Sequence, residues 1–199
     1  TDEANPRYAE HRGDQLQNVG SVGKLLAAMG LFQALADTWP DDLARRESVL
    51  RDTVMTADDF SVSDHHTIRL FNVDTKELVR RPMAIGDQGS LWEYLDWMLS
   101  VSSNSAAAMV MRDAMLLRHF GKDYPVSEEQ IKAFFDTTPS SELTQLFQQT
   151  FWEPVTRNGL SLDEIRQGSF FTRQGKVNVN GGGNSYATAG SLMQFLVKM

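Results

Sequence analysis

The chain of 199 residues contains no cysteine, and this absence removes several kinds of chemistry. Without thiols there is no disulfide framework, no thiolate nucleophile and no cysteine-rich zinc site. The sequence also lacks any apolar run of about 18 residues, the length a helix needs to cross a bilayer. We therefore expect no membrane span. The lack of cysteine fits both the cytosol and the periplasm.

Basic residues are outnumbered, with 19 Lys and Arg against 26 Asp and Glu, which gives a net charge of −7. This balance argues against nucleic acid or an anionic membrane surface as the main partner, but it allows a small substrate in a locally positive cleft. The first residues carry neither the basic nor the apolar region of a signal peptide. A start at Thr1 rather than Met suggests a processed or trimmed chain.

The composition is that of a folded protein, with 41% apolar and 10% aromatic residues. The length fits one domain. Residues 1–17 are polar and without periodicity, so they are predicted to form an N-terminal arm ahead of the main region at 18–199. Apolar periodicity and caps predict helices at 21–37, 41–55, from Ser90 onward, from the 100–105 turn to about 119, from Ser127 onward, at 140–151 and at 188–199. A short β-hairpin is predicted from 67–71 and 78–83, whereas 152–183 is expected to be mostly irregular.

The stretch from Asn18 to Leu35 places Ser21 and Lys24 at i and i+3, at the start of a helix with apolar residues on all sides. An amine one turn from a hydroxyl can make that serine nucleophilic. The alternative is that Ser21 only caps the helix.

A second serine-rich turn, Ser102-Ser-Asn104, leads into another predicted buried helix 81 residues after Ser21. Three segments follow one another in the order found in a known family. They are Asn18-Val-Gly-Ser-Val-Gly-Lys-Leu, the run from Ile85-Gly-Asp to Asn104-Ser-Ala-Ala, and Tyr186-Ala-Thr-Ala-Gly-Ser-Leu. In these segments the chain resembles the serine β-lactamases and penicillin-binding proteins, and most closely the class A β-lactamases. The resemblance covers roughly residues 18–199.

This resemblance implies an α+β fold of the β-lactamase/transpeptidase type, an acyl-enzyme mechanism without cofactor or metal, and a periplasmic or secreted location. The substrate would be a β-lactam, a D-alanyl peptide or a related amide or ester. Ser21 would be the nucleophile and Lys24 its base, since burial lowers a lysine pKa. Ser102 would relay a proton to the leaving nitrogen, and Asn104 would bind the substrate amide and help to fix Lys24. Ser102 and Asn104 could also cap the following helix, which is compatible with catalysis.

The chain departs from the family pattern at several points. Ser103 stands where the family often has Asp. The third motif, Lys-Thr-Gly or a variant, is absent, and so are the terminal strands of the family's sheet. Because a helical layer with a large apolar face needs a cover, we expect a further segment or another chain to supply the sheet.

Phe151-Trp-Glu-Pro-Val-Thr-Arg-Asn158 is similar to the loop that carries the deacylation base in class A enzymes. Glu153 is accordingly a candidate base for the hydrolytic water. Asn158 falls one position late, however, and an ordinary surface glutamate before a turn proline is the alternative.

Other candidates give weaker patterns. His65 and His66 suggest a metal, but neighbouring side chains are expected to point apart and no third ligand is evident. Asp58, Asp59 and Asp64 lack the spacing of a calcium loop. Two further functions stay open: a D,D-carboxypeptidase or transpeptidase, and a non-catalytic relative that binds a ligand or serves as a scaffold.

Overall fold

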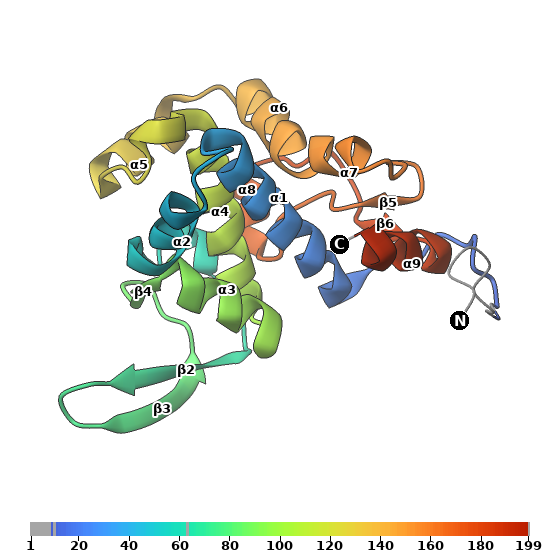
Figure 1. The fold of residues 1–199 in the computed structure, drawn as a ribbon. Helices are drawn as coiled ribbons and strands as arrows, with labels where there is room; N and C mark the ends of the chain where they lie inside the picture. The colour runs from blue at the N-terminus through green and yellow to red at the C-terminus, as the bar shows by residue number, and fades with distance from the viewer. Residues whose placement is uncertain (1–8, 10, 63, 199) are drawn as a thin grey trace.

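The computed structural model describes residues 9, 11–62 and 64–198, and it is mainly helical (Figure 1). The helices are α1 (Lys24–Thr38), α2 (Leu43–Asp52), α3 (Leu91–Ser100), α4 (Asn104–Phe120), α5 (Glu128–Thr137), α6 (Ser140–Phe151), α7 (Glu153–Arg157), α8 (Arg173–Asn178) and α9 (Ala189–Lys198). Short 3-10 turns occur at η1 (Gly20–Gly23), η2 (Asp59–Ser61) and η3 (Gly121–Asp123). The predicted α+β class is confirmed, because small sheets accompany these helices.

The described residues also form three antiparallel sheets of two strands each. They are β1 (Val54–Thr56) with β4 (Gln88–Ser90), β2 (Thr67–Asn72) with β3 (Glu77–Pro82), and β5 (Ile165–Arg166) with β6 (Tyr186–Ala187). The β2–β3 hairpin, which the sequence predicts, projects away from the helices (Figure 1). No larger sheet occurs in the described ranges, so the expected covering sheet has no counterpart there.

Helix α4 lies at the centre of the main core. Every residue from Ser105 to Leu117 is buried, and small and Met side chains allow α1, α3 and α6 to pack closely around it. Helix α3 begins as its sequence predicts: the Ser90 hydroxyl accepts from the Glu93 N–H, and the Glu93 carboxylate accepts from the Ser90 N–H. These caps and apolar faces fix the helices that carry the candidate site.

A smaller apolar cluster joins the two ends of the described chain. Phe195 of α9 packs with residues such as Val19, Leu26 and Ile165. Gln17 pairs with Ala187 as an isolated antiparallel bridge, and the Gly190 N–H donates to the Gly13 carbonyl. The predicted arm therefore has residues 11–17 docked against β6 and α9, while residues 1–8 and 10 lie outside the described residues.

One predicted element needs correction. The helix expected at 41–55 ends at Asp52, because Val54–Thr56 instead pairs with Gln88–Ser90 as a strand. A strand of three residues has no periodicity that a sequence pattern could reveal. The region 152–183 is mostly irregular, as expected, but it also contains α7, α8 and β5, each too short to show an apolar repeat.

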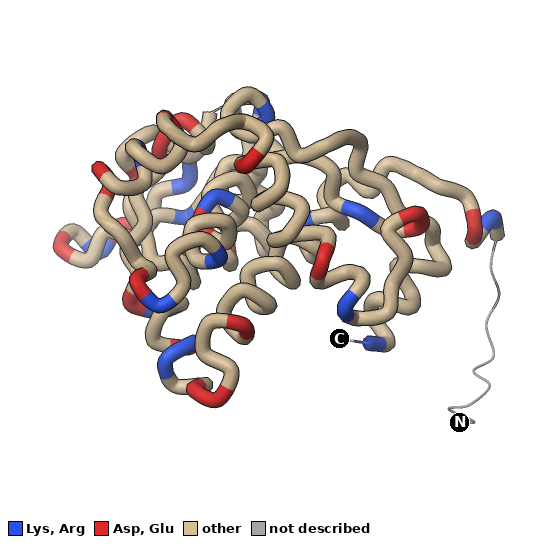
Figure 2. The backbone as a smooth tube through the Cα atoms, turned by 90° about the horizontal axis from the view of Figure 1, so that it is seen from above, with Lys and Arg blue, Asp and Glu red and all other residues tan. Residues whose placement is uncertain are grey.

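Charged residues are spread over the molecule. Acidic and basic positions are interspersed along the backbone in the view of Figure 2. Among the described helices, none combines the length and the apolar character that crossing a bilayer requires.

Candidate active site

The turn that precedes α1 brings Ser21 and Lys24 together. Gly20 has φ +50°, which glycine adopts without a Cβ penalty, and its N–H donates to Asn18 Oδ1 at 2.8 Å. The following 3-10 turn, η1, aligns side chains at i and i+3. As a result, Lys24 Nζ donates to Ser21 Oγ at 3.1 Å. Ser21 is exposed, whereas Lys24 is only 2% exposed.

The second serine-rich turn supplies the other partners of Lys24. Its Nζ donates to the Ser102 carbonyl at 2.9 Å, to Ser102 Oγ at 3.2 Å and to Asn104 Oδ1 at 2.8 Å. Ser102 has φ +59°, a conformation that costs a residue with a Cβ free energy and persists only where its surroundings hold it. The structure thus brings together four of the predicted site residues, Ser21, Lys24, Ser102 and Asn104.

Burial governs the protonation of Lys24. Removing the ammonium group from water lowers the pKa of Lys24 below its ordinary value, and the negative charge of Asp64 offsets part of this fall. The Phe171 ring lies 4.8 Å from Nζ and shields it on one side. A lysine in these surroundings reaches its neutral, basic form at a lower pH than a lysine in water.

The sequence did not single out Asp64 as part of this site. Its Oδ2 accepts hydrogen bonds from Ser103 Oγ at 3.0 Å, from the Asn104 N–H at 2.6 Å and from the Ser105 N–H at 3.0 Å. Its Oδ1 accepts from His66 Nδ1 at 2.6 Å. Asp64 therefore caps α4 at the turn that contacts Lys24. No local motif indicates the contact between Asp64 and the Asn104 turn, because these two segments are about 40 residues apart in the sequence.

The structure does not bring Glu153 to this cluster. Glu153 lies at the start of α7 and pairs with Arg118, which also contacts Asp37. Asp37 is near the C-terminal end of α1, about 20 Å from its N-terminal end at about 1.5 Å per residue. Glu153 is thus held in a surface ion-pair network at the end of α1 opposite Lys24, and its geometry does not fit a base acting at Ser21.

Gln167 is a second residue that the sequence did not indicate. Its side chain is buried, its Nε2 donates to the Ser169 carbonyl at 2.6 Å, and its Oε1 has no hydrogen-bond partner among the described residues. A Cβ atom at Gly23 would overlap this oxygen. Gly23, between Ser21 and Lys24, therefore makes room for the Gln167 amide against the start of α1.

The histidine pair differs from its prediction. The ligand atoms of Asp64, His65 and His66 lie within 4.8 Å of one another, and the two rings stack with centroids 4.9 Å apart, so they do not point apart. Both Asp64 oxygens already accept hydrogen bonds, which explains the grouping without a metal ion. Asp58 pairs with the buried Arg112 rather than with Asp59 or Asp64.

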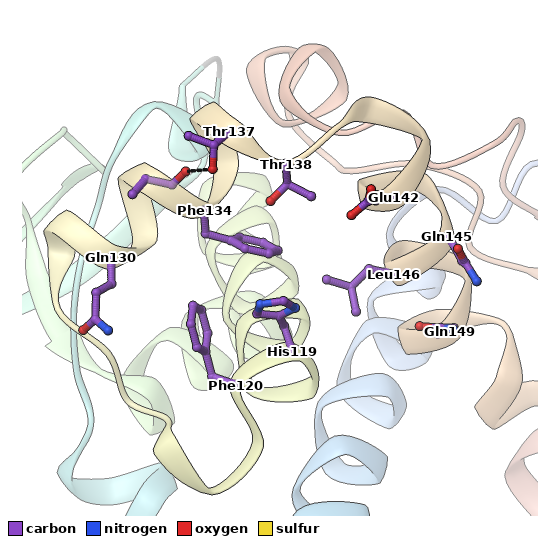
Figure 3. Close-up of a pocket in the computed structure, with 11 residues that line it drawn as sticks. His119, Phe120, Gln130, Phe134, Thr137, Thr138, Glu142, Gln145, Leu146 and Gln149 are labelled. Atoms are coloured by element: carbon purple, nitrogen blue, oxygen red, sulfur yellow. Dashed lines mark hydrogen bonds between the residues drawn. The ribbon is translucent and has the colours of Figure 1, made fainter.

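Two well-formed pockets of the described chain lie away from Ser21. A pocket of about 670 Å³ is formed between the end of α4, α5 and α6. Figure 3 shows His119, Phe120 and Phe134 on one side of it and Glu142 and Leu146 on the other. A second pocket, of about 540 Å³, lies beside η2 and α5. Neither is lined by the Ser21–Lys24 cluster.

Comparison with known proteins gives no relative to guide the assignment. No family model matches the chain, and searches of curated proteins and of solved structures give no match. The functional argument therefore depends on the chemistry of the residues around Lys24.

Proposed function

We propose that this protein is a serine hydrolase of the β-lactamase and penicillin-binding type, which forms an acyl-enzyme on Ser21. The observation that carries the proposal is the contact of the buried Lys24 Nζ with Ser21 Oγ, Ser102 Oγ and Asn104 Oδ1. The substrate class is a β-lactam, a D-alanyl peptide or a related amide or ester.

In the proposed reaction, Ser21 Oγ attacks the substrate carbonyl while neutral Lys24 takes the hydroxyl proton. The 3.1 Å separation of these two atoms is within the range for such a proton transfer. The lowered pKa of Lys24 makes the neutral base accessible. The backbone N–H of Ser21, near a helix N-terminus, would supply half of an oxyanion hole.

Ser102 and Asn104 serve the second half of acylation in this scheme. Ser102 Oγ is 3.2 Å from Lys24 Nζ, so it can pass the proton from Lys24 to the leaving nitrogen. Asn104 uses its Oδ1 to hold Lys24, which leaves its amide NH₂ to donate to a substrate carbonyl. Both residues also belong to the turn that begins α4, so their capping and catalytic roles are compatible.

The position of Glu153 favours slow release of the acyl group over rapid β-lactam turnover. Glu153 pairs with Arg118 near the end of α1 opposite Lys24, so we propose no role for it in holding a water at Ser21. Asp64, whose charge acts on Lys24, already accepts hydrogen bonds on both oxygens. We therefore propose D,D-carboxypeptidase or transpeptidase activity as the second candidate. Both candidate functions share an acyl-enzyme on Ser21, and the one formed with a penicillin is expected to be long-lived.

Labelling with a fluorescent penicillin tests this proposal. We expect covalent labelling of the wild type, no labelling of Ser21→Ala, and normal labelling of Ser141→Ala, an exposed serine in α6. Equal labelling of wild type and Ser21→Ala would exclude Ser21 as the nucleophile. Nitrocefin turnover compared with the rate of acyl release then separates a β-lactamase from a carboxypeptidase.

A further inference from the structure

We propose that Asp64 is the positioning residue of the candidate site, because its carboxylate holds the Ser102–Asn104 turn in the conformation that contacts Lys24. This inference deepens the proposed function and rests on it. Asp64 itself makes no hydrogen bond to Ser21 or Lys24. It acts through the residues that do.

The hydrogen bonds of Asp64 reach each residue of the turn that follows Ser102. One oxygen accepts from Ser103 Oγ and from the N–H groups of Asn104 and Ser105, at 2.6 to 3.0 Å. Three donors on one carboxylate oxygen fix both the backbone and a side chain of this turn. The preceding residue, Ser102, is thereby kept at φ +59°, where its carbonyl and its hydroxyl both contact Lys24 Nζ.

The second oxygen of Asp64 explains why the carboxylate stays in place. It accepts from the backbone N–H of His65 and of His66 and from His66 Nδ1. Since the ionised carboxylate only accepts, His66 Nδ1 must carry the hydrogen. The Asp64 side chain is 1% exposed, so these donors replace the water that the charge has lost.

The charge of Asp64 has a second effect on the site. Asp64 is the charged group that raises the pKa of Lys24 against the effect of burial, and His66 and Lys24 are the titratable groups that face Asp64. A neutral side chain at this position would leave the lowering by burial uncompensated. The same residue thus sets both the geometry of the turn and the protonation of the base.

This arrangement also accounts for Ser103, the departure from the family pattern at the middle of Ser-Ser-Asn. The resemblance leads us to expect Asp there. In this chain the carboxylate comes from a position 39 residues earlier, and Ser103 donates to it. A negative charge therefore lies at this turn as the resemblance leads us to expect, but it comes from Asp64 and not from the middle residue of the motif.

The test compares Asp64→Asn with the wild type and with Asp96→Asn, an exposed position in α3. The penicillin acylation rate is measured against pH, and the Lys24 titration is followed separately by NMR of its side-chain carbon. For Asp64→Asn we expect the maximal acylation rate to fall on the order of 100-fold, as for a misplaced reacting group. We also expect the Lys24 pKa to fall further, and the pH profile to move to lower pH. Asp96→Asn should match the wild type.

A wild-type acylation rate or an unchanged Lys24 pKa in Asp64→Asn would overturn the proposal, whereas a slower rate with a lower pKa supports it. If Asp64→Asn does not fold, Ser103→Ala removes one hydrogen bond while the charge stays, and it should slow acylation by a smaller factor. Normal acylation of Ser103→Ala would then count against the proposal. Failure of the wild type to be acylated would contradict the proposed function, and the Lys24 titration would still decide the role of Asp64.

Discussion

At the scale of single residues, the buried Lys24 ammonium group is the feature that needs an explanation. Lysine is seldom fully buried unless it is paired. Here the ammonium has three hydrogens and four oxygen neighbours, and one nearby carboxylate, Asp64, partly balances its charge. Such a buried charge would destabilise the fold if its partners were removed. A lysine whose pKa is shifted by burial and by one specific carboxylate is also a candidate functional residue.

Asp64 gives a prediction for stability against acid. Burial acts to raise its pKa, but hydrogen bonds from His66, Ser105 and Ser103 outweigh this and hold the pKa at about 2, below the ordinary 3.8. The stability that ionised Asp64 contributes to the fold is therefore fully present above about pH 4 and is lost as the pH falls through about 2. Wild type should be more stable than Asp64→Asn at pH 7, and this difference should shrink by about 2 kcal/mol at pH 2, as measured by urea denaturation. A difference that does not change with pH would mean that Asp64 has an ordinary pKa.

Sequence reasoning selected Ser21, Lys24, Ser102 and Asn104, because two short motifs stood at helix starts in a recognisable order. It missed Asp64 and Gln167, since each comes from an irregular segment and meets the site only through tertiary contacts. It also assigned Glu153 to the site from a local match to the Trp-Glu-Pro motif. A local match does not show where Glu153 lies relative to Ser21, because that depends on the fold.

At the scale of elements, close packing between α1 and α6 depends on Gly30. A Cβ at Gly30 would lie 2.6 Å from a Phe151 ring carbon and 2.8 Å from the Thr150 carbonyl oxygen. Gly30→Ala should gain about 1 kcal/mol of helix propensity yet lose about 1–3 kcal/mol by overpacking, so we expect net destabilisation in urea denaturation.

The control for this substitution is Gln33→Ala on the same helix, a half-buried residue whose side chain donates a hydrogen bond to Asp37. It should change the free energy of unfolding by less than about 0.5 kcal/mol. A Gly30→Ala protein more stable than the wild type would show that α1 and α6 are farther apart than described.

Helices that begin at a cap and carry an apolar face were predictable, as the helix starts at Ser90 and Ser127 illustrate. The strands Val54–Thr56 and Gln88–Ser90 were not, because each has three residues and exists only through its partner. The same holds for α7 and α8, which are shorter than two turns. Local pattern therefore predicted the long elements, and tertiary contacts determined the short ones.

At the scale of the whole molecule, the fold joins segments about 80 residues apart into one cluster around Lys24. Helices α1 and α4 pack side by side, so the turns at their starts meet. Because the central helix is buried along its length, this relation is fixed by the core rather than by the site itself. The chemistry proposed for Ser21 depends on that arrangement.

The most direct test of the central claim is the intact mass of the protein after incubation with benzylpenicillin, followed by mapping of the modified peptide. The account predicts a mass increase of one penicillin molecule, located on Ser21 and absent from Ser21→Ala and from Lys24→Met. An adduct on another residue, or an unmodified wild type under conditions where the protein is folded, would contradict it.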